Sequence, residues 1–491
     1  GAFENPAYTF WAQSYDDGDY YAAGLRQFHD FEYLEEDDFE LKIMVDKFTE
    51  DEKFEIDTVY LVEGEKQNYS RFIIENKKQQ KLYGEIHIQG PKYVFLLTNS
   101  EDPAKQERFF KSFSFKPWHY EQEFKEYQDT AYHISMRSPM EINNFQSFLD
   151  DLYGNYGYTS EEDNSHQGEL NEKTIYFPET GEQILISLET LHKYESYENL
   201  EEFWEDQKNS YDYYAAYEAG ADQDNNQLHW LRDSLLYSSS DSNYLTEARI
   251  ITYSGYKTHR IIKKKLIVEN GAIYGLTVYS DSLGYFSAFA DTALLSFRPS
   301  MDTLFGLPIT TPKADLFFEA LKSGDSLNIA QASNSVYMVD FAEKDAEQLL
   351  DLINNFKAEG FDRDARLGLV NQYARLKMDD NLDFLEELYY KNRDSSAYQF
   401  EILEALAGMD TKESVKRFKK LILDEPPFGS NTFAYYTMFN QFRDSLNLAV
   451  ELYPDLLSLT DFEDYRMRIY SLLSELLDTG MVKGKDYKVK Y

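Results

Sequence analysis

The chain has 491 residues, 42% of them hydrophobic, which is enough for roughly two to four domains with buried cores. Its formal net charge is −39, and so acidic a surface repels polyanions, which excludes nucleic acid as an expected partner. Cysteine is absent, so thiol catalysis, disulfides and cysteine-based zinc sites are excluded as well. No apolar run approaches the ~18 residues that a membrane span needs.

The first section of the chain has the pattern of a β-sheet domain. The pair Asp17-Gly18 separates two aromatic runs and predicts a hairpin. Residues 37–63 alternate acidic and apolar side chains, which fits either strands or a helix. Between Ser70 and Ser100, three runs rich in β-branched and aromatic residues are separated by turns, and this pattern predicts a β-meander. A helix is expected over 105–113.

The second section repeats this order. It begins with a strand-like run near Ala131, and helical spacing follows around Leu200, Phe203 and Trp204. A second meander is predicted over 247–280, with breaks at Ser254-Gly255 and Asn270-Gly271, and a helical stretch over 286–295 comes after it.

Nearly the same four residues close both sections. They are Ser-Phe-Lys-Pro at 114–117 and Ser-Phe-Arg-Pro at 296–299, and the proline cannot continue the preceding helix or strand. We interpret the motif as the end of a duplicated α/β domain. The two copies are expected to superimpose, with Phe115 and Phe297 buried at equivalent places.

After Pro312 the strand patterns give way to helical periodicity. The helical segments are 343–360, 362–378, 381–392, 396–409, 411–427, 444–459 and 465–480. The residues expected to cap helices at their N-termini are Asp362, Asn381, Ser396 and Thr411. Short helices with short connections predict the stacked hairpins of a HEAT-like solenoid, with a compact helical bundle as the alternative.

The predicted fold class is α+β: two antiparallel-sheet α/β sandwich domains followed by an all-α helical-repeat domain. The first sandwich could be incomplete, because its first strand and helix are hard to identify. The predicted boundaries are 1–120 and 121–300 for the sandwiches, 301–312 for a linker and 313–491 for the helical region. We expect the helical region to fold on its own and to carry a partner-binding surface, and we expect the native chain to be longer than this segment.

Two resemblances add to these expectations. In the second section, the order of strand, helix, meander and closing helix with the aromatic-rich end FADTALLSFRP resembles the PsbP/Mog1-type α-β-α sandwich. In the first section, ERFFKSFSF after KYVFLLTNS is similar to the closing segment of the same kind of domain. The helical region is similar to HEAT repeats. The combination resembles large envelope proteins of Bacteroidota-like bacteria, which implies a non-catalytic scaffold, other envelope proteins as partners, and a periplasmic or cell-surface location.

The sequence contains none of the local catalytic motifs GxSxG, HExxH, GxxxxGK[ST] and GxGxxG. Its eight histidines never occur at the i, i+4 spacing of a helical metal site. Carboxylate pairs are too frequent in so acidic a chain to indicate glycosidase chemistry. We therefore predict no enzyme activity and no cofactor, with a hydrolase using dispersed carboxylates and a small-ligand or carbohydrate-binding protein as alternatives.

Two acidic segments are candidates for calcium. Oxygen ligands recur at EF-hand-like positions in one of them, namely Asp222, Asp224, Asn226 and Asp233. However, Gln227 stands where the sharp turn needs glycine, and the residues after it look like the start of a helix, so an acidic loop that caps this helix is preferred. The second segment, Asp16 to Asp19, is preferred as a turn.

A tyrosine cluster and a lysine run complete the candidates for binding. The tyrosines could line a sugar or peptide groove, although their spacing also fits a helix packing on a sheet: Tyr211, Tyr213, Tyr214 and Tyr217. The run Lys263–Lys265 is interpreted as a solvated strand edge or face, with an anion site as the alternative.

Overall fold

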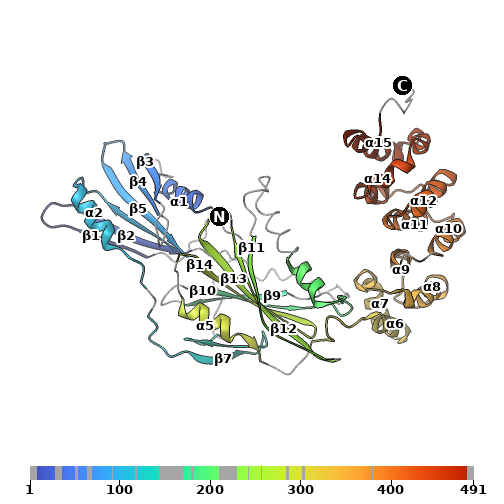
Figure 1. Ribbon diagram of the computed structural model, residues 1–491, viewed down its shortest axis with the longest axis horizontal. Helices are drawn as coiled ribbons and strands as arrows, with labels where there is room; N and C mark the ends of the chain where they lie inside the picture. The colour runs from blue at the N-terminus through green and yellow to red at the C-terminus, as the bar shows by residue number, and fades with distance from the viewer. Residues whose placement is uncertain are drawn as a thin grey trace. The chain divides into compact units, whose positions relative to one another are not determined.

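A computed structural model gives the fold of the chain (Figure 1). It describes residues 8–27, 36–49, 53–62, 69–90, 92–116, 119–142, 168, 170–177, 182–208, 229–241, 243–255, 257–283, 287–300, 305–376, 378 and 380–483. These form two compact units that divide between Thr311 and Pro312, and the second unit also takes Tyr194–Ser196. Antiparallel sheets build the first unit and helices the second, which confirms the predicted α+β class.

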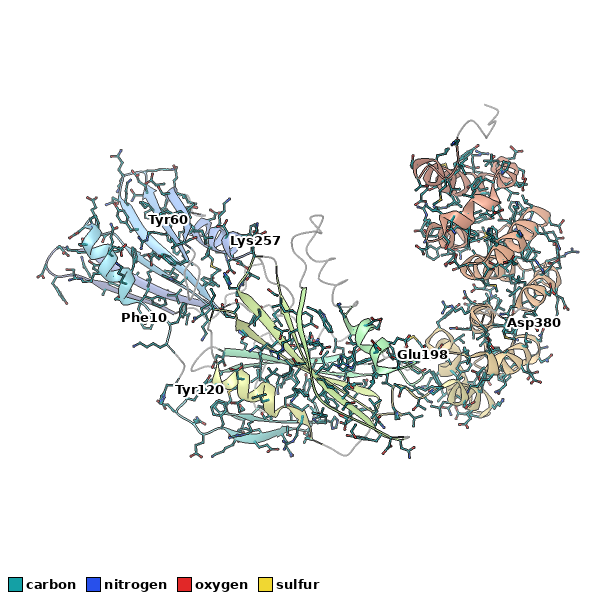
Figure 2. All side chains as sticks on the ribbon, in the orientation of Figure 1. Phe10, Tyr60, Tyr120, Glu198, Lys257 and Asp380 are labelled. Carbon is teal, nitrogen blue, oxygen red and sulfur yellow. The ribbon has the colours of Figure 1, made fainter. Side chains whose placement is uncertain are left out.

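The first sheet contains six antiparallel strands in the order β1-β2-β6-β5-β4-β3. Their bounds are β1 Tyr8–Gln13, β2 Tyr20–Gln27, β3 Phe54–Val62, β4 Tyr69–Asn76, β5 Lys81–Gln89 and β6 Lys92–Thr98. Strands β1 and β2 form the predicted hairpin, and β4 to β6 form the predicted meander. Phe10 lies on β1 and Tyr60 on β3, which are the two edges of this sheet (Figure 2).

Helices cover both faces of the first sheet. Helix α1 (Asp37–Asp46) packs its Leu41 against Phe72 and Ile86, and helix α2 (Pro103–Ser112) packs against Val94 and Leu96 of β6. The residues of β6 that alternate with Val94 and Leu96 join the α1 core instead, so the two helices lie on opposite faces. The segment 37–63 therefore supplies both a helix and a strand, and the first copy is complete.

The second sheet has the order β11-β12-β13-β14-β10-β9. Its strands are β9 Leu170–Phe177, β10 Glu182–Thr190, β11 His229–Ser240, β12 Leu245–Ser254, β13 Arg260–Glu269 and β14 Ala272–Asp281. Taken in chain order, β9 to β14 occupy the positions of β1 to β6, so the two sheets share one topology. Helix α5 (Ala288–Ser296) covers one face, and the helical residues 200–208 cover the other.

The expected equivalence of Phe115 and Phe297 is wrong by two residues. Phe297 follows the last residue of α5 and is completely buried. The residue in the same position after α2 is Phe113, whereas Phe115 is only partly buried, with its ring 5.0 Å from that of Phe113. The shared tetrapeptide therefore marks the same helix end in the two copies, but in a shifted register.

The interpretation of Lys263–Lys265 as a solvated strand edge or face is wrong for the edge, because β13 lies between β12 and β14, and wrong for the face at Lys265. Lys265 is buried, and its Nζ donates a hydrogen bond to the backbone oxygen of Phe297 at 2.7 Å. Burial lowers the pKa of Lys265 to about 8. A cation is favoured beside the exposed carbonyls at a helix C-terminus, so this lysine holds the end of α5.

A small third sheet, which the sequence did not predict, lies beside α5. Its strands are β7 Lys125–Asp129, β8 Ile134–Ser138 and β15 Arg298–Pro299. Strand β15 contains the last two residues of the second tetrapeptide, and Arg298 pairs with Ser135. The motif thus ends the domain by joining this additional sheet.

Buried polar contacts join the two copies within the first unit. Thr258 Oγ1 donates to Asp37 Oδ1 at 2.7 Å, and Arg260 Nε lies 3.7 Å from the same oxygen. The backbone N–H of Gly90 donates to Asp281 Oδ2 at 3.1 Å. The side chains of Asp37 and Arg260 are 4% and 2% exposed, so these charges depend on each other for solvation.

The second unit consists of successive short helices. Their bounds are α6 Ala314–Lys322, α7 Ser326–Asn334, η1 Val336–Met338, η2 Glu343–Asp345, α8 Ala346–Asn355, α9 Arg363–Arg375, α10 Asn381–Lys391, α11 Ser396–Gly408, α12 Lys412–Asp424, α13 Thr432–Asn440, η3 Gln441–Arg443, α14 Leu446–Ala449, η4 Val450–Leu452, η5 Asp455–Asp461 and α15 Glu463–Asp478. The segment 444–459 is not one helix, because Pro454 interrupts it.

Two of the four predicted N-terminal helix caps are correct. Asp362 and Thr411 accept hydrogen bonds from the backbone N–H groups of Ala365 and Ser414, as N-caps do. The N-caps of α10 and α11 are Asp380 and Ser395 instead, one residue before those expected, and the Asn381 side chain donates to the backbone oxygen of Tyr373.

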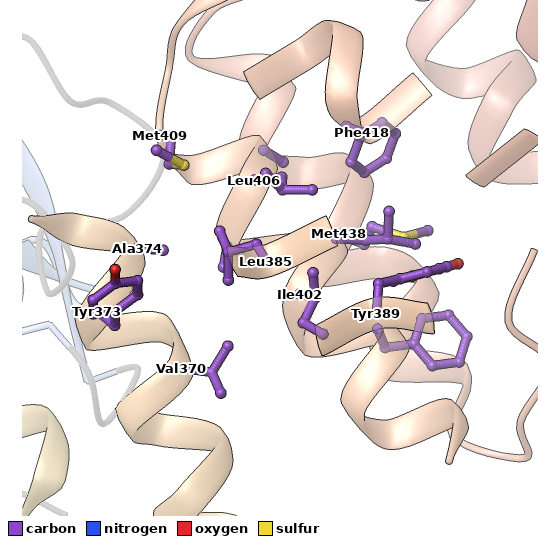
Figure 3. Packing of buried hydrophobic residues seen from close by; sticks show 14 of the residues in the cluster. Val370, Tyr373, Ala374, Leu385, Tyr389, Ile402, Leu406, Met409, Phe418 and Met438 are labelled. Atoms are coloured by element: carbon purple, nitrogen blue, oxygen red, sulfur yellow. The ribbon is translucent and has the colours of Figure 1, made fainter. Parts of the chain in front are cut away.

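One hydrophobic core runs through the helical unit (Figure 3). Neighbouring helices pack in the sequence α9, α11, α13, α15, while α10 packs against α12, which is the contact pattern of stacked hairpins. Tyr194, from the segment after β10, is fully buried in this core with its ring 5.7 Å from Phe317. The helical core therefore also uses residues that precede Pro312.

Candidate binding groove

A groove of about 730 Å³ opens along α9, α11 and α13 in the helical unit. Its lining residues include Arg363, Asp364, Leu367, Asn371 and Arg375 of α9, Ala397, Phe400, Glu401, Glu404 and Gly408 of α11, and Phe433, Ala434 and Thr437 of α13. On each helix these residues recur three or four positions apart, so each helix presents one stripe to the groove.

The floor of the groove contains two glutamates of the central helix. Asn371 Nδ2 on α9 donates to Glu401 Oε1 at 3.2 Å, and Thr437 Oγ1 on α13 donates to Glu404 Oε2 at 2.8 Å. The opposite face of α11 is apolar and buried through Ile402, Leu403 and Leu406. Core packing thus fixes the helix, and one neutral hydrogen bond on each side fixes the direction of each carboxylate.

Burial changes the protonation of this floor. The pKa of Glu401 is raised to about 7, chiefly because the surrounding protein replaces water around its carboxylate. The negative charges of Glu404 and Asp364 raise it further, and the hydrogen bond from Asn371 opposes them. Glu401 therefore titrates near neutral pH, and a charge that enters the groove changes its protonation.

Two exposed aromatic residues line the groove. Phe433 is 65% exposed, its ring lies 5.9 Å from that of Tyr436, and Arg468 lies over Tyr436 at 5.2 Å. Tyr337, from η1, is 53% exposed, and its pKa is raised to about 12 by partial burial and then by the negative charges of Glu401 and Glu404. Aromatic and arginine side chains of this kind dominate the energy of protein interfaces.

Of the residues that the sequence proposed as sites, those that the structure describes do not line this groove. Asp222, Asp224 and Asn226 lie outside the described residues, as do Tyr211, Tyr213, Tyr214 and Tyr217. Asp233 lies on strand β11 and accepts a 2.7 Å hydrogen bond from Arg249, so the expectation that a helix begins before it is wrong.

The second acidic segment forms the turn between β1 and β2. Lys105 of α2 forms ion pairs with Asp17 and Asp19, which compensates the charge of this turn within the protein itself. In the described ranges, no group of three or more His, Asp or Glu side chains is arranged to hold a metal ion. The described helices include none that is long and apolar enough to span a bilayer.

The groove residues did carry a signal in the sequence. Segment 396–409 is mostly apolar, and its two charged residues, Glu401 and Glu404, are three residues apart and therefore share a helical face. A carboxylate pair on a helix that is otherwise suited to the core indicates a polar pocket or a bound partner. In a chain with 88 acidic residues this pair did not stand out.

Comparisons with known proteins leave the family open. No family model and no curated protein matches the chain, so the PsbP/Mog1 and HEAT resemblances stay predictions. Two solved structures of the immunity protein TplEi of T6SS from Pseudomonas aeruginosa are 15% identical. The complex with an "L" peptide aligns over 60% of this chain and 92% of that chain with a TM-score of 0.16, and the apo form over 61% and 93%, also with 0.16. Lipovitellin is 13% identical over 81% of this chain and 40% of that chain, with a TM-score of 0.17, and TM-scores this low do not establish a shared fold.

Proposed function

We propose that the chain is a non-catalytic interaction protein whose helical unit binds a segment of another protein in the groove of α9, α11 and α13. The observation that carries this proposal is the groove itself: a cavity of about 730 Å³ with a polar floor and two exposed aromatic residues in its lining. Stacked helical hairpins present such extended surfaces to partner chains. The sheet domains then act as the scaffold that the helical unit extends.

The size and the lining of the groove suit a peptide segment. Apolar walls at Leu367, Phe400 and Ala434 can exclude water from side chains that enter, while the amide and carboxylate groups of the floor fix their orientation. The exposed rings at Phe433 and Tyr337 provide contact area at little cost in conformational entropy.

Selection of a random 12-residue peptide library on the immobilised full chain tests the proposal. We expect enriched peptides that bind the wild type and that lose binding to Ala397→Trp, because the indole fills the groove at α11. The matched control is Ala358→Trp, at a position outside the lining of the groove. Failure to enrich any peptide, or equal binding to both variants, would reject the groove as the binding site.

A hydrolase is the second candidate, and the protonation of Glu401 favours it. A carboxyl group with a pKa of about 7 beside a second carboxylate in a cavity has the properties of a general acid. Release of reducing ends from a polysaccharide panel by the wild type, and its loss in Glu404→Gln, would support catalysis over binding alone.

The cell-envelope location that the resemblance implies remains a proposal of the same kind. Fractionation of bacterial cells that express the chain from its own gene tests it, and recovery in the cytoplasmic fraction would reject it.

A further inference from the structure

We infer that the segment bound in the groove presents a lysine or arginine side chain to Glu401 and Glu404. This inference rests on the proposed function and names the chemistry of the partner. The partner is therefore a basic segment of a protein. The cationic head of its lysine or arginine lies between the carboxylates of α11, and the aliphatic stem lies along the apolar walls.

The hydrogen-bond partners of the two glutamates provide the first argument. Each carboxylate is held by a neutral group, the amide of Asn371 or the hydroxyl of Thr437. Within the described part of the chain, neither glutamate takes part in an ion pair. A partly buried carboxylate without a cation is poorly solvated, so a cationic ligand is stabilised there more strongly than at the open surface.

The other charges of the groove provide the second argument. Asp364 adds a third carboxylate on α9, and Arg363 partly compensates it, with Nε at 3.4 Å from Oδ1. Arg375 lies three helical turns further along the same stripe, and among the described residues neither arginine forms an ion pair with Glu401 or Glu404. The pair of glutamates therefore attracts a cation.

The shape of the groove suits a long basic side chain better than a short one. Lysine and arginine carry three or four methylene groups below the charge, which pack along apolar surface while the charged head reaches polar partners. Ala434 and the exposed ring of Phe433 provide such a surface in the lining of the groove. The net charge of −39 also steers basic segments toward the protein and repels acidic ones.

Binding of a cation should release a proton from Glu401. The titratable and charged groups that line the groove with it are Glu404 on α11, Asp364, Arg363 and Arg375 on α9, and Tyr337 on η1. A cation favours the ionised carboxylate, so affinity should rise between pH 6 and pH 8 and level off above it. Arg363 and Arg375 stay charged throughout this range and therefore add no pH dependence.

Calorimetric titration with a library-selected peptide gives the test. Its single basic residue is replaced by norleucine, and we expect about a tenfold loss of affinity for the wild type and a much smaller loss for Glu404→Gln. Affinity for the wild type should rise from pH 6 to pH 8, and Glu401→Gln should remove this rise. Thermal melts of both variants confirm that they are folded.

The outcomes separate the inference from the proposed function. Selected peptides that lose binding to Ala397→Trp, yet carry no enriched basic residue or bind Glu404→Gln as tightly as the wild type, would overturn the inference and leave the groove as the binding site. A library without any groove-dependent peptide would reject the proposed function itself.

Discussion

The substitution Glu401→Gln removes a titrating carboxyl from the groove and leaves the length of the side chain unchanged. The amide oxygen can still accept the hydrogen bond from Asn371, which is 3.2 Å long in the wild type. The variant therefore separates the effect of charge from that of packing.

The magnitude follows from the pKa of the wild-type carboxyl, which rises from 4.5 to about 7 on folding. This shift corresponds to about 3 kcal/mol, and we expect about 2 kcal/mol because the side chain keeps some contact with water. The folded state binds the proton more tightly than the unfolded state, so the free energy of unfolding of the wild type falls as pH rises from 4.5 to 7. Glutamine has no such penalty, and the variant should match the wild type at pH 4 and exceed it by about 2 kcal/mol at pH 8.

Urea unfolding of the full chain at several pH values gives the measurement. All four tryptophans precede Thr311, so tryptophan fluorescence follows the first unit and far-UV circular dichroism follows mainly the helical unit. The control is Glu387→Gln, an exposed glutamate on α10. The reasoning is refuted if the helical transition of Glu401→Gln keeps the pH dependence of the wild type between pH 4 and pH 8.

Three further predictions concern the framework around the groove. Tyr194→Ala should destabilise the helical unit by about 3 kcal/mol, because its ring is fully buried beside Phe317, and the far-UV transition in urea should shift while tryptophan fluorescence does not. Arg260→Ala should destabilise the first unit by about 3 kcal/mol, since it leaves Asp37 buried without its cation; an unchanged fluorescence transition would contradict this. The melting temperature should be the same in EDTA and in millimolar calcium, and a large drop in EDTA would show that a metal supports the fold.

Local patterns predicted the elements well where turns and periodicity agree. The Asn270-Gly271 turn between β13 and β14 is an example, because Gly271 has a φ of +79° that most residues avoid. Two predictions were wrong where the structure depends on contacts that are distant in the sequence. They are the solvent exposure of Lys265 and the start of a helix near His229. The burial of Lys265 depends on the carbonyl of Phe297, which lies 32 residues away and is not visible in a local window.

The groove could not be located from the sequence because three helices build it. Asn371, Glu401 and Thr437 are each ordinary residues of a helix, and only the packing of α9 and α13 on either side of α11 brings them to one floor. The sequence predicted α9 and α11 within 362–378 and 396–409, but it predicted neither α13 nor which stripe each helix would turn toward its neighbours. Acidic pairs are frequent in this chain, so only the burial of Glu401 beside Glu404 distinguishes the pair on α11 as a candidate site.

The most direct test of the account compares two exposed phenylalanines of the helical unit. Phe433 lines the groove and is 65% exposed, whereas Phe428 is 48% exposed and lies outside the lining. The affinity of the full chain for a library-selected peptide is measured for Phe433→Ala and Phe428→Ala. The account predicts a loss of at least about tenfold for Phe433→Ala and little change for Phe428→Ala. Equal affinities for the two variants would contradict the claim that this groove is where the protein binds its partner.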